Sequence, residues 1–390
     1  MTRVFFYLAV FLSLLSQLPM VLESGLDAYL KLSWIPLTAI IVSKYPSDLF
    51  NRKLLFFFIF VIVFGCYLLM MQSLTVKEYI TLGGDYYNIV ISFLIFVDCF
   101  VFWKYNNSEK DYKILVWFMM LGCMILGIVV YVFFIQYADI TSMTYAYDAK
   151  NSLAQILFVG CVMTLTSINL FHSKIARNIL IVCMVLLFLI IMLLKSRATI
   201  LCVAFVMAYY MTEYGTKKQR KYLCLVILGA ILFILLNEAA YQLVVVNILF
   251  ANRDASSASS LSSGRSELIM KALEIVSDNY IFGIGYKYLD CMPISILLQY
   301  GGIGLIIVAT FLLILAVKVL NLNRNTSINM ASFLIFWSFI INSLFEAYPP
   351  FGPGVKCFPL WMLLGFAFAK KKIETSDLSH NRSLIRYLLC

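Results

Sequence analysis

Long apolar runs, separated by short polar segments, recur along the whole chain. Runs of about 17 to 25 residues recur among them, which is the length that crosses a bilayer core of about 30 Å as an α-helix. Hydropathy and charge together predict about twelve membrane-spanning helices. They are expected near residues 4–22, 28–43, 54–71, 88–103, 114–136, 151–171, 179–194, 198–214, 222–249, 294–317, 330–347 and 355–369.

One long segment of the second half, Ser256 to Asp290, is too polar to lie in lipid. It begins with a Ser-rich stretch and continues into Gly264-Arg265, after which apolar residues recur on one helical face. These residues are Leu268, Ile269, Ala272, Leu273, Ile275 and Val276. The spacing predicts a helix that begins at Arg265 and lies along the membrane surface. Its positive N-terminal end and Arg265 both favour a bound anion.

The composition excludes a soluble protein. The chain is 63% hydrophobic and only 13% charged, whereas soluble domains are about a quarter charged. We therefore predict an all-α polytopic membrane protein with one large outer loop. The expected divisions are spans one to nine in residues 1–249, the outer loop in 250–293, spans ten to twelve in 294–372 and a cytoplasmic tail in 373–390.

Charge predicts the orientation in the membrane. The net charge is +10, but the basic residues fall mainly in alternate short connections, as the positive-inside rule predicts for cytoplasmic segments. This distribution disfavours nucleic acid as a partner. With a cytoplasmic N-terminus, the inner segments hold about 20 of the 30 Lys and Arg residues. Both termini are therefore expected in the cytoplasm, and the large loop on the exterior, which is the periplasm of a Gram-negative cell.

Charged residues at the outer ends of spans are the best candidates for chemistry, because ionisable groups at membrane depth are costly. Lys195 and Arg197 lie at the junction of two spans, on the side where positive charge is disfavoured. They are either functional, the interpretation we favour, or snorkelling anchors. Asp290 precedes one span and Glu346 ends another. Each is either a general base or a helix-end carboxylate paired with a cation, and the sequence leaves both open.

Other reactive residues give weaker signals. Both histidines lie on the predicted inner side and no Cys/His cluster has ligand spacing, so neither a metal nor another cofactor is expected. Asp98 and Glu238 lie deeper in apolar spans and are expected to be structural partners within the bundle, with pairing to an outer cation as the alternative for Glu238. Cys291 and Cys357 are placed to meet an oxidising compartment, and we favour two free thiols over a disulfide between them.

Four motifs occur in an order that is similar to that of a known family. They are Lys195-Ser196-Arg197-Ala198-Thr199, Gly264-Arg265 before a helix, Phe282-Gly283-Ile284-Gly285 with glycines expected in a tight turn, and Leu297-Leu298-Gln299-Tyr300-Gly301-Gly302-Ile303-Gly304. This order resembles the O-antigen polymerase and ligase superfamily, mainly over Lys195 to Leu313. The resemblance implies a membrane architecture like that of the C-type glycosyltransferases.

The resemblance also implies a metal-independent, inverting glycosyltransferase that uses lipid-linked sugar. The growing glycan would move from undecaprenyl pyrophosphate to the non-reducing end of a lipid-linked repeat unit. Arg197 and Arg265 match the arginines proposed to hold the pyrophosphate in that family, and arginine binds phosphate oxygens bidentately. Lys195, Lys287 and Arg253 are further candidates for binding the substrate.

The chain departs from the family at one place. Ligases and many other members of the family carry a His-Asn pair just before the span that follows the loop, whereas this chain has Asp290-Cys291. The difference disfavours a ligase and makes Asp290 the first candidate for the base that activates the acceptor hydroxyl, with Glu346 second.

We therefore expect an O-antigen-type polysaccharide polymerase of the bacterial inner membrane. The alternatives are an O-antigen ligase, a flippase of lipid-linked oligosaccharides or another twelve-span transporter, and a membrane scaffold. A flippase would have short outer loops and charges in the middle of the bundle, which is the reverse of the pattern here. The expected partners are undecaprenyl-pyrophosphate-linked oligosaccharides, the membrane and a chain-length regulator protein.

Overall fold

The structure is a computed structural model that describes residues 2–74, 84–137, 147, 149–214, 217–249, 265–277, 279–285, 289–346, 351–352 and 355–369. Within these ranges the chain is helical and has no strand. The α-helices are α1 (Thr2–Leu15), α2 (Pro19–Glu23), α3 (Asp27–Lys31), α4 (Trp34–Lys44), α5 (Arg52–Leu74), α6 (Gly84–Tyr105), α7 (Glu109–Phe133), α8 (Lys150–Ser167), α9 (Lys174–Leu193), α10 (Arg197–Tyr214), α11 (Lys217–Leu236), α12 (Glu238–Tyr241), α14 (Arg265–Ser277), α15 (Met292–Leu320), α16 (Ser327–Ser343) and α17 (Phe358–Ala369).

Short helical turns complete these elements. The segment η4 (Gln242–Leu249) is π-helical, and the 3-10 turns are η1 (Pro46–Phe50), η2 (Ile135–Tyr137), η3 (Ile168–Leu170) and η5 (Val355–Cys357). Among the described residues, six helices are long and apolar enough to cross a membrane. They span Arg52–Met71, Tyr86–Tyr105, Glu109–Tyr137, Lys150–Leu170, Lys174–Leu193 and Met292–Leu320. The protein is therefore an all-helical polytopic membrane protein, while the count of twelve spans stays a prediction.

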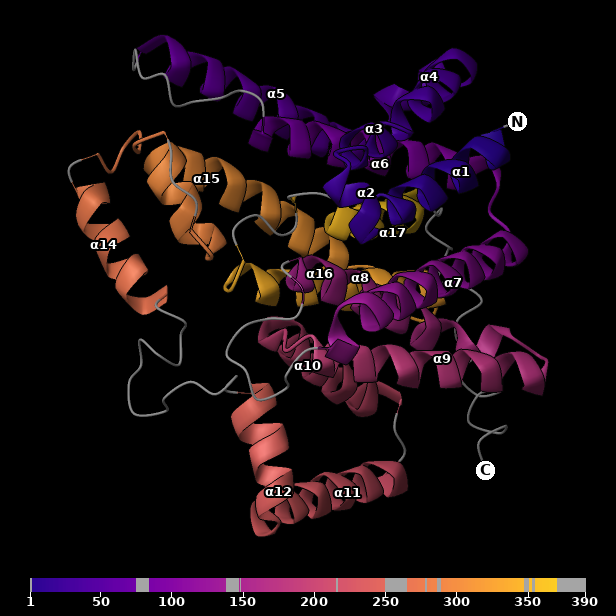
Figure 1. Ribbon diagram of the computed structural model, residues 1–390. Coiled ribbons are helices and arrows are strands. Elements are labelled where there is room, and N and C mark those ends of the chain that lie inside the picture. Colours follow the sequence, from indigo (N-terminus) through magenta and orange to yellow (C-terminus); the bar gives the residue numbers. More distant parts are fainter. Residues whose placement is uncertain are drawn as a thin grey trace.

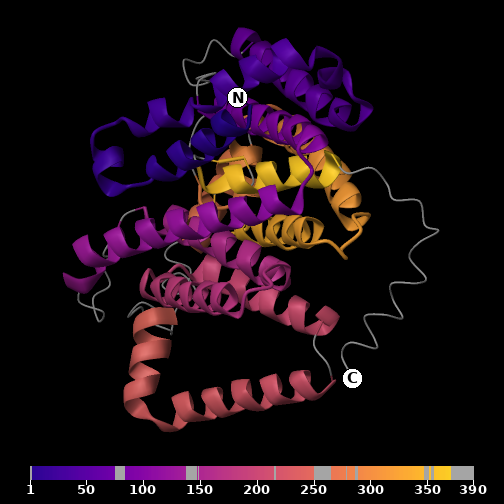
Figure 2. The same cartoon turned by 90° about the vertical axis from the view of Figure 1, so that its right-hand side faces the viewer.

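Several predicted spans are broken, which corrects their expected bounds. The first span divides before Pro19, which begins α2 because proline tolerates the first turn of a helix and not its interior. The span at 222–249 ends as α11 at Leu236, and Asn237 has an extended backbone with φ −106° and ψ 110°. The Asn237 side chain accepts a hydrogen bond from the amide of Ala240, so it caps α12. Figures 1 and 2 show α11 and α12 at an angle, extending away from the other helices.

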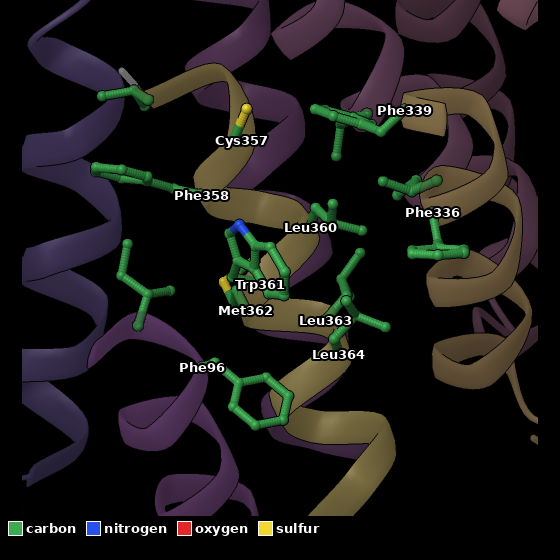
Figure 3. Close-up of a cluster of buried hydrophobic side chains, with 14 of the residues drawn as sticks. Phe96, Phe336, Phe339, Cys357, Phe358, Leu360, Trp361, Met362, Leu363 and Leu364 are labelled. Atoms are coloured by element: carbon green, nitrogen blue, oxygen red, sulfur yellow. The ribbon is translucent and has the colours of Figure 1, made fainter. Parts of the chain in front are cut away.

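The core of the bundle is built around α17. Every side chain from Phe358 to Phe368 is buried, and Figure 2 shows this yellow helix in the middle of the molecule. Helix α17 packs closely on α6, where a Cβ atom at Gly365 would lie 2.5 Å from the carbonyl oxygen of Phe96. Trp361 lies in this core with Phe96 of α6 and with aromatic residues of α16 (Figure 3). Helix α17 thus fixes the position of α16, whose C-terminal end reaches the candidate site.

Candidate active site

Helix α14 packs on the first half of α15 and carries Arg265 at its N-terminus. Its bounds agree with the helix predicted from the sequence. Ala272 and Val276 are buried in a small apolar cluster with Leu298 of α15. Leu268 and Leu273 are 52% and 41% exposed, so the predicted apolar face divides into a part that packs on α15 and a part that does not. Whether α14 lies on a membrane surface stays a prediction.

Helix α15 is kinked at Gly301, which has φ 63° and ψ −170°. The segment that follows α14 lies against this kink, where the interrupted helix leaves backbone groups available. Four backbone hydrogen bonds join them. The amides of Ile284 and Gly285 donate to the carbonyls of Leu298 and Gln299 at 2.8 and 3.0 Å, and the amides of Gly302 and Ile303 donate to the carbonyls of Tyr280 and Ile281 at 2.7 and 3.4 Å. The predicted span at 294–317 is therefore not one continuous helix.

Two glycines allow this close approach. A Cβ atom on Gly283 would lie 2.5 Å from the Gly301 nitrogen, and one on Gly301 would lie 2.2 Å from the Ile281 carbonyl oxygen. Gly283 and Gly285 also have positive φ values of 69° and 77°, which glycine adopts without steric cost. The expected tight turn is confirmed, and the two glycine motifs form one interlocked unit that holds α14 beside α15.

Helix α10 carries the second predicted arginine. Helix α9 ends at Leu193, and Lys195 then adopts φ 52°, a left-handed conformation that is uncommon for a residue with a side chain. The turn makes Arg197 the first residue of α10. Lys150, at the start of α8, donates from Nζ to the Lys195 carbonyl at 3.5 Å. The start of α10 is therefore held by α8.

One pocket, with a volume of about 400 Å³, lies where these elements meet. It is lined by Arg197, Ala198 and Leu201 of α10, Arg265, Ser266 and Ile269 of α14, Asp290, and Leu344 and Phe345 after α16. The structure thus brings together Arg197, Arg265 and Asp290, all predicted as site residues. One part of the lining is charged and another is apolar. Such a pocket suits an amphipathic ligand with an anionic group.

Arg265 and Asp290 form an ion pair inside this pocket. Nη2 of Arg265 lies 2.8 Å from Oδ2 of Asp290, and the two side chains are 25% and 35% exposed. The pair is accessible to a ligand that enters the pocket. An anion that binds Arg265 competes with Asp290 for the guanidinium group.

Glu346 directly follows the lining residue Phe345 in the chain and is buried. Its Oε1 accepts a hydrogen bond from Nδ2 of Asn151 at 2.6 Å, and its Oε2 lies 3.6 Å from Nζ of Lys356. Burial raises the pKa of Glu346, the positive charge of Lys356 opposes the rise, and the negative charge of Asp290 adds to it. The two candidate carboxylates are therefore close enough to interact.

The remaining predicted residues have varied positions. Lys195 is buried and does not line the pocket, while Arg253 and Lys287 lie outside the described residues. Asp98 is fully buried in α6 and accepts a hydrogen bond from Oγ1 of Thr38 at 2.7 Å, as expected of a structural partner. Glu238 is exposed at the start of α12, so the prediction that it is a structural partner within the bundle is wrong.

Cys291 and Cys357 are the two cysteines that were expected to meet an oxidising compartment. The thiols of Cys291 and Cys357 are both free and buried. Within the part of the chain that the structure describes, no group of three or more His, Cys, Asp or Glu side chains is arranged to hold a metal ion.

Three polar residues near the pocket were not predicted from the sequence: Asn151, Lys150 and Lys356. All three lie at the starts of predicted spans on the predicted outer side. Positive charge is disfavoured on the outer side, which was the reason to select Lys195 and Arg197. The same reason applies to Lys150 and Lys356. Asn151 has no comparable signal, because an uncharged polar residue at the end of a span is common.

The fold and site define a helical membrane protein with an amphipathic pocket that contains arginines. Residues 182–305 match the Wzy_C family model, described as O-antigen ligase. The matched range includes Arg197, Arg265 and Asp290 and ends before Glu346. The match supports the O-antigen polymerase and ligase superfamily and a role in surface polysaccharide biosynthesis, and it does not distinguish polymerase from ligase. No curated protein and no solved structure matches the chain.

Proposed function

We propose that the chain is an O-antigen-type polysaccharide polymerase. It transfers a growing glycan from undecaprenyl pyrophosphate to the non-reducing end of a new lipid-linked repeat unit. One observation carries this proposal: Arg197, Arg265 and Asp290 come from separate elements, line a single pocket and lie within the range of the family match.

The pyrophosphate of the donor binds the two arginines. Each guanidinium group is permanently charged and matches the geometry of phosphate oxygens. Leu201, Ile269 and Leu344 supply the apolar lining, which suits the isoprenoid chain next to the pyrophosphate. Fixed positive charges stabilise the pyrophosphate more as it leaves than in the ground state, and this difference lowers the reaction barrier.

Donor binding also frees the first-choice base. Without a ligand, Asp290 accepts a charge-assisted hydrogen bond from Arg265. When the pyrophosphate binds the guanidinium group of Arg265 in place of Asp290, the Asp290 carboxylate is available to accept a proton from a hydroxyl group of the acceptor sugar. Glu346 remains the second candidate, because it is buried and does not line the pocket.

The proposed reaction is a single displacement. The acceptor hydroxyl oxygen forms a bond to the anomeric carbon of the donor glycan while the bond between that carbon and the pyrophosphate oxygen breaks. The hydroxyl proton passes to Asp290, and undecaprenyl pyrophosphate leaves with the electron pair. A single displacement inverts the anomeric configuration and requires no metal. We place this reaction on the outer face of the bacterial cytoplasmic membrane.

Reconstitution of the purified full chain in liposomes tests the proposal. Given only undecaprenyl-pyrophosphate-linked repeat units, a polymerase produces a ladder of lipid-linked products, which gel electrophoresis and mass spectrometry resolve. Transfer only when lipid A core is added identifies a ligase and overturns the proposal. Movement of the substrate between leaflets without any new glycosidic bond identifies a flippase and overturns it as well.

A further inference from the structure

A chain of buried and half-buried polar groups runs from Glu346 to the start of α10. Asn151, in the first turn of α8, uses both ends of its side-chain amide. Its Nδ2 donates to Glu346 at 2.6 Å, and its Oδ1 accepts from Oγ of Ser196 at 3.1 Å. A carboxylate can only accept and a hydroxyl group can donate, so an amide is the side chain that satisfies both neighbours.

The chain continues into α10. Oγ of Ser196 lies 3.0 Å from Oγ1 of Thr199, and both hydroxyl groups are buried. A hydroxyl group has one hydrogen, which Ser196 gives to Asn151, so Thr199 is the donor in this second bond. The carbonyl of Ser196 accepts from the amide of Ile200 at 3.0 Å. Ser196 is thereby fixed through its side chain and its backbone.

Arg197 is the next residue in the chain and lines the pocket. Its position therefore depends on Ser196, and the position of Ser196 depends on Asn151. At the other end of the polar chain, Glu346 is held by Asn151 on one oxygen and by Lys356 on the other. Groups that are joined in a hydrogen-bonded network away from bulk solvent have little freedom to reorient.

From this geometry we infer that Asn151 is a positioning residue, which orients Arg197 toward the donor pyrophosphate through its hydrogen bonds to Ser196 and Glu346. The inference rests on the proposed function, because it concerns the same pocket. It adds a residue that lies outside the range of the family match and outside the pocket lining.

The test compares Asn151→Ala with Gln155→Ala in the purified full chain. Gln155 lies one turn further along α8, is buried and donates to Oδ1 of Asn342 on α16 at 2.6 Å. Both substitutions remove a hydrogen bond of the same length, but Gln155 is not bonded to Ser196 or Glu346. We expect Asn151→Ala to reduce glycan transfer by on the order of 10²-fold, as a small misplacement of a binding group can. Gln155→Ala is expected to leave the transfer rate within about twofold of the wild type.

A double-mutant cycle separates positioning from a general structural role. Arg197→Lys is expected to reduce the affinity for undecaprenyl pyrophosphate much less in the Asn151→Ala background than in the wild type, because the arginine is already misplaced. In the Gln155→Ala background its effect should be unchanged. Equal effects of Arg197→Lys in all three backgrounds would contradict the inference.

The variant Asn151→Asp adds a readout that depends on pH and retains the shape of the side chain if Asn151→Ala does not fold. The introduced carboxyl group can donate to Glu346 only when it is protonated. Relative to the wild type, transfer by this variant should therefore rise as the pH falls. A constant ratio at all pH values would overturn the inference.

Failure of this inference is distinguishable from failure of the proposed function. A wild type that binds undecaprenyl pyrophosphate without forming polymer contradicts the proposed polymerase activity. The double-mutant cycle, which measures affinity for undecaprenyl pyrophosphate, still tests the role of Asn151 in that case. A wild type that binds none contradicts the proposed pyrophosphate site and the inference together. A wild type that forms polymer, with Asn151→Ala and Gln155→Ala equally active, contradicts only the role of Asn151.

Discussion

Two ion pairs lie near each other at the candidate site and differ in their surroundings. Arg265 and Asp290 are joined at 2.8 Å in an open pocket, where their side chains are 25% and 35% exposed. Lys356 and Glu346 are 3.6 Å apart, and their side chains are only 3% and 6% exposed. An exposed pair contributes about 0–1 kcal/mol to stability and exchanges partners easily. A buried pair is costly to break, because either charge alone is left without solvent.

The difference in exposure suits the two ion pairs to different roles. The exposed pair is available to a ligand and is suited to binding and catalysis. The buried pair is held in one arrangement together with Asn151 and is suited to holding the pocket in place. This comparison is the physical reason for preferring Asp290 over Glu346 as the base.

The largest effect on stability is expected when the buried ion pair of Lys356 and Glu346 loses its cation. Lys356→Met leaves Glu346 without its cation and should lower the free energy of unfolding by about 3–5 kcal/mol. Thermal or denaturant unfolding of the purified protein in detergent measures this loss. The double variant Lys356→Met with Glu346→Leu should recover most of it, because no charge remains buried. If Lys356→Met unfolds like the wild type, the buried pair does not differ from the exposed one.

The catalytic comparison uses isosteric changes of the two carboxylates. Asp290→Asn should reduce transfer by about 10²- to 10⁴-fold, which is the contribution of a general base. Glu346→Gln should have a smaller effect, because the amide oxygen can still accept from Asn151. Initial rates with lipid-linked repeat units measure both, with Asp139→Asn as a control in another segment that is predicted to be outside. The reverse order of effects would identify Glu346 as the base.

The arginines of the pocket should affect activity and leave stability nearly unchanged. Arg197→Ala and Arg265→Ala should each reduce transfer by about 10²- to 10³-fold, as the loss of a preorganised charge does. Cells that carry either variant should retain one repeat unit on the lipid A core and lack long polymer on gels. Arg52→Ala, at the exposed start of α5, is the matched control. Normal ladders from both pocket variants would contradict the assignment of the site.

A smaller effect is expected in the pH dependence of stability. Burial raises the pKa of Glu346 above its ordinary value of 4.5. The folded protein therefore keeps this proton to a higher pH than the unfolded chain does. Between the ordinary and the raised pKa, the free energy of unfolding of the wild type should fall as the pH rises, relative to that of Glu346→Gln. Unfolding of both proteins across acidic pH tests this sign.

A tag at Ser259 tests on which side of the membrane the pocket lies. Of the changes proposed, it is expected to affect activity least. We predict that the tag is accessible from outside the cell without permeabilising the membrane. A matched tag at Lys217, in a predicted cytoplasmic segment, should be protected. Accessibility only from the cytoplasm would place the pocket, which lies between α10, α14 and α16, on the wrong side for polymer synthesis.

The sequence by itself determined the class of the protein. The length of the apolar runs requires helices that satisfy their own backbone groups in lipid. It also determined the start of α14 at Arg265, because helical periodicity and a preceding glycine are local signals. Arg197 and Asp290 were found for a similar reason, since a charge at the end of an apolar span is visible in the sequence.

Only the tertiary structure decided how these parts combine. Hydropathy does not detect the breaks at Asn237 and Gly301, because one small or polar residue hardly changes the average over a span. Asn151 and Glu346 are 195 positions apart in sequence, and their contact exists because α16 packs against α8. Local patterns reflect the preferences of each segment for lipid or water, whereas the site depends on which segments pack together.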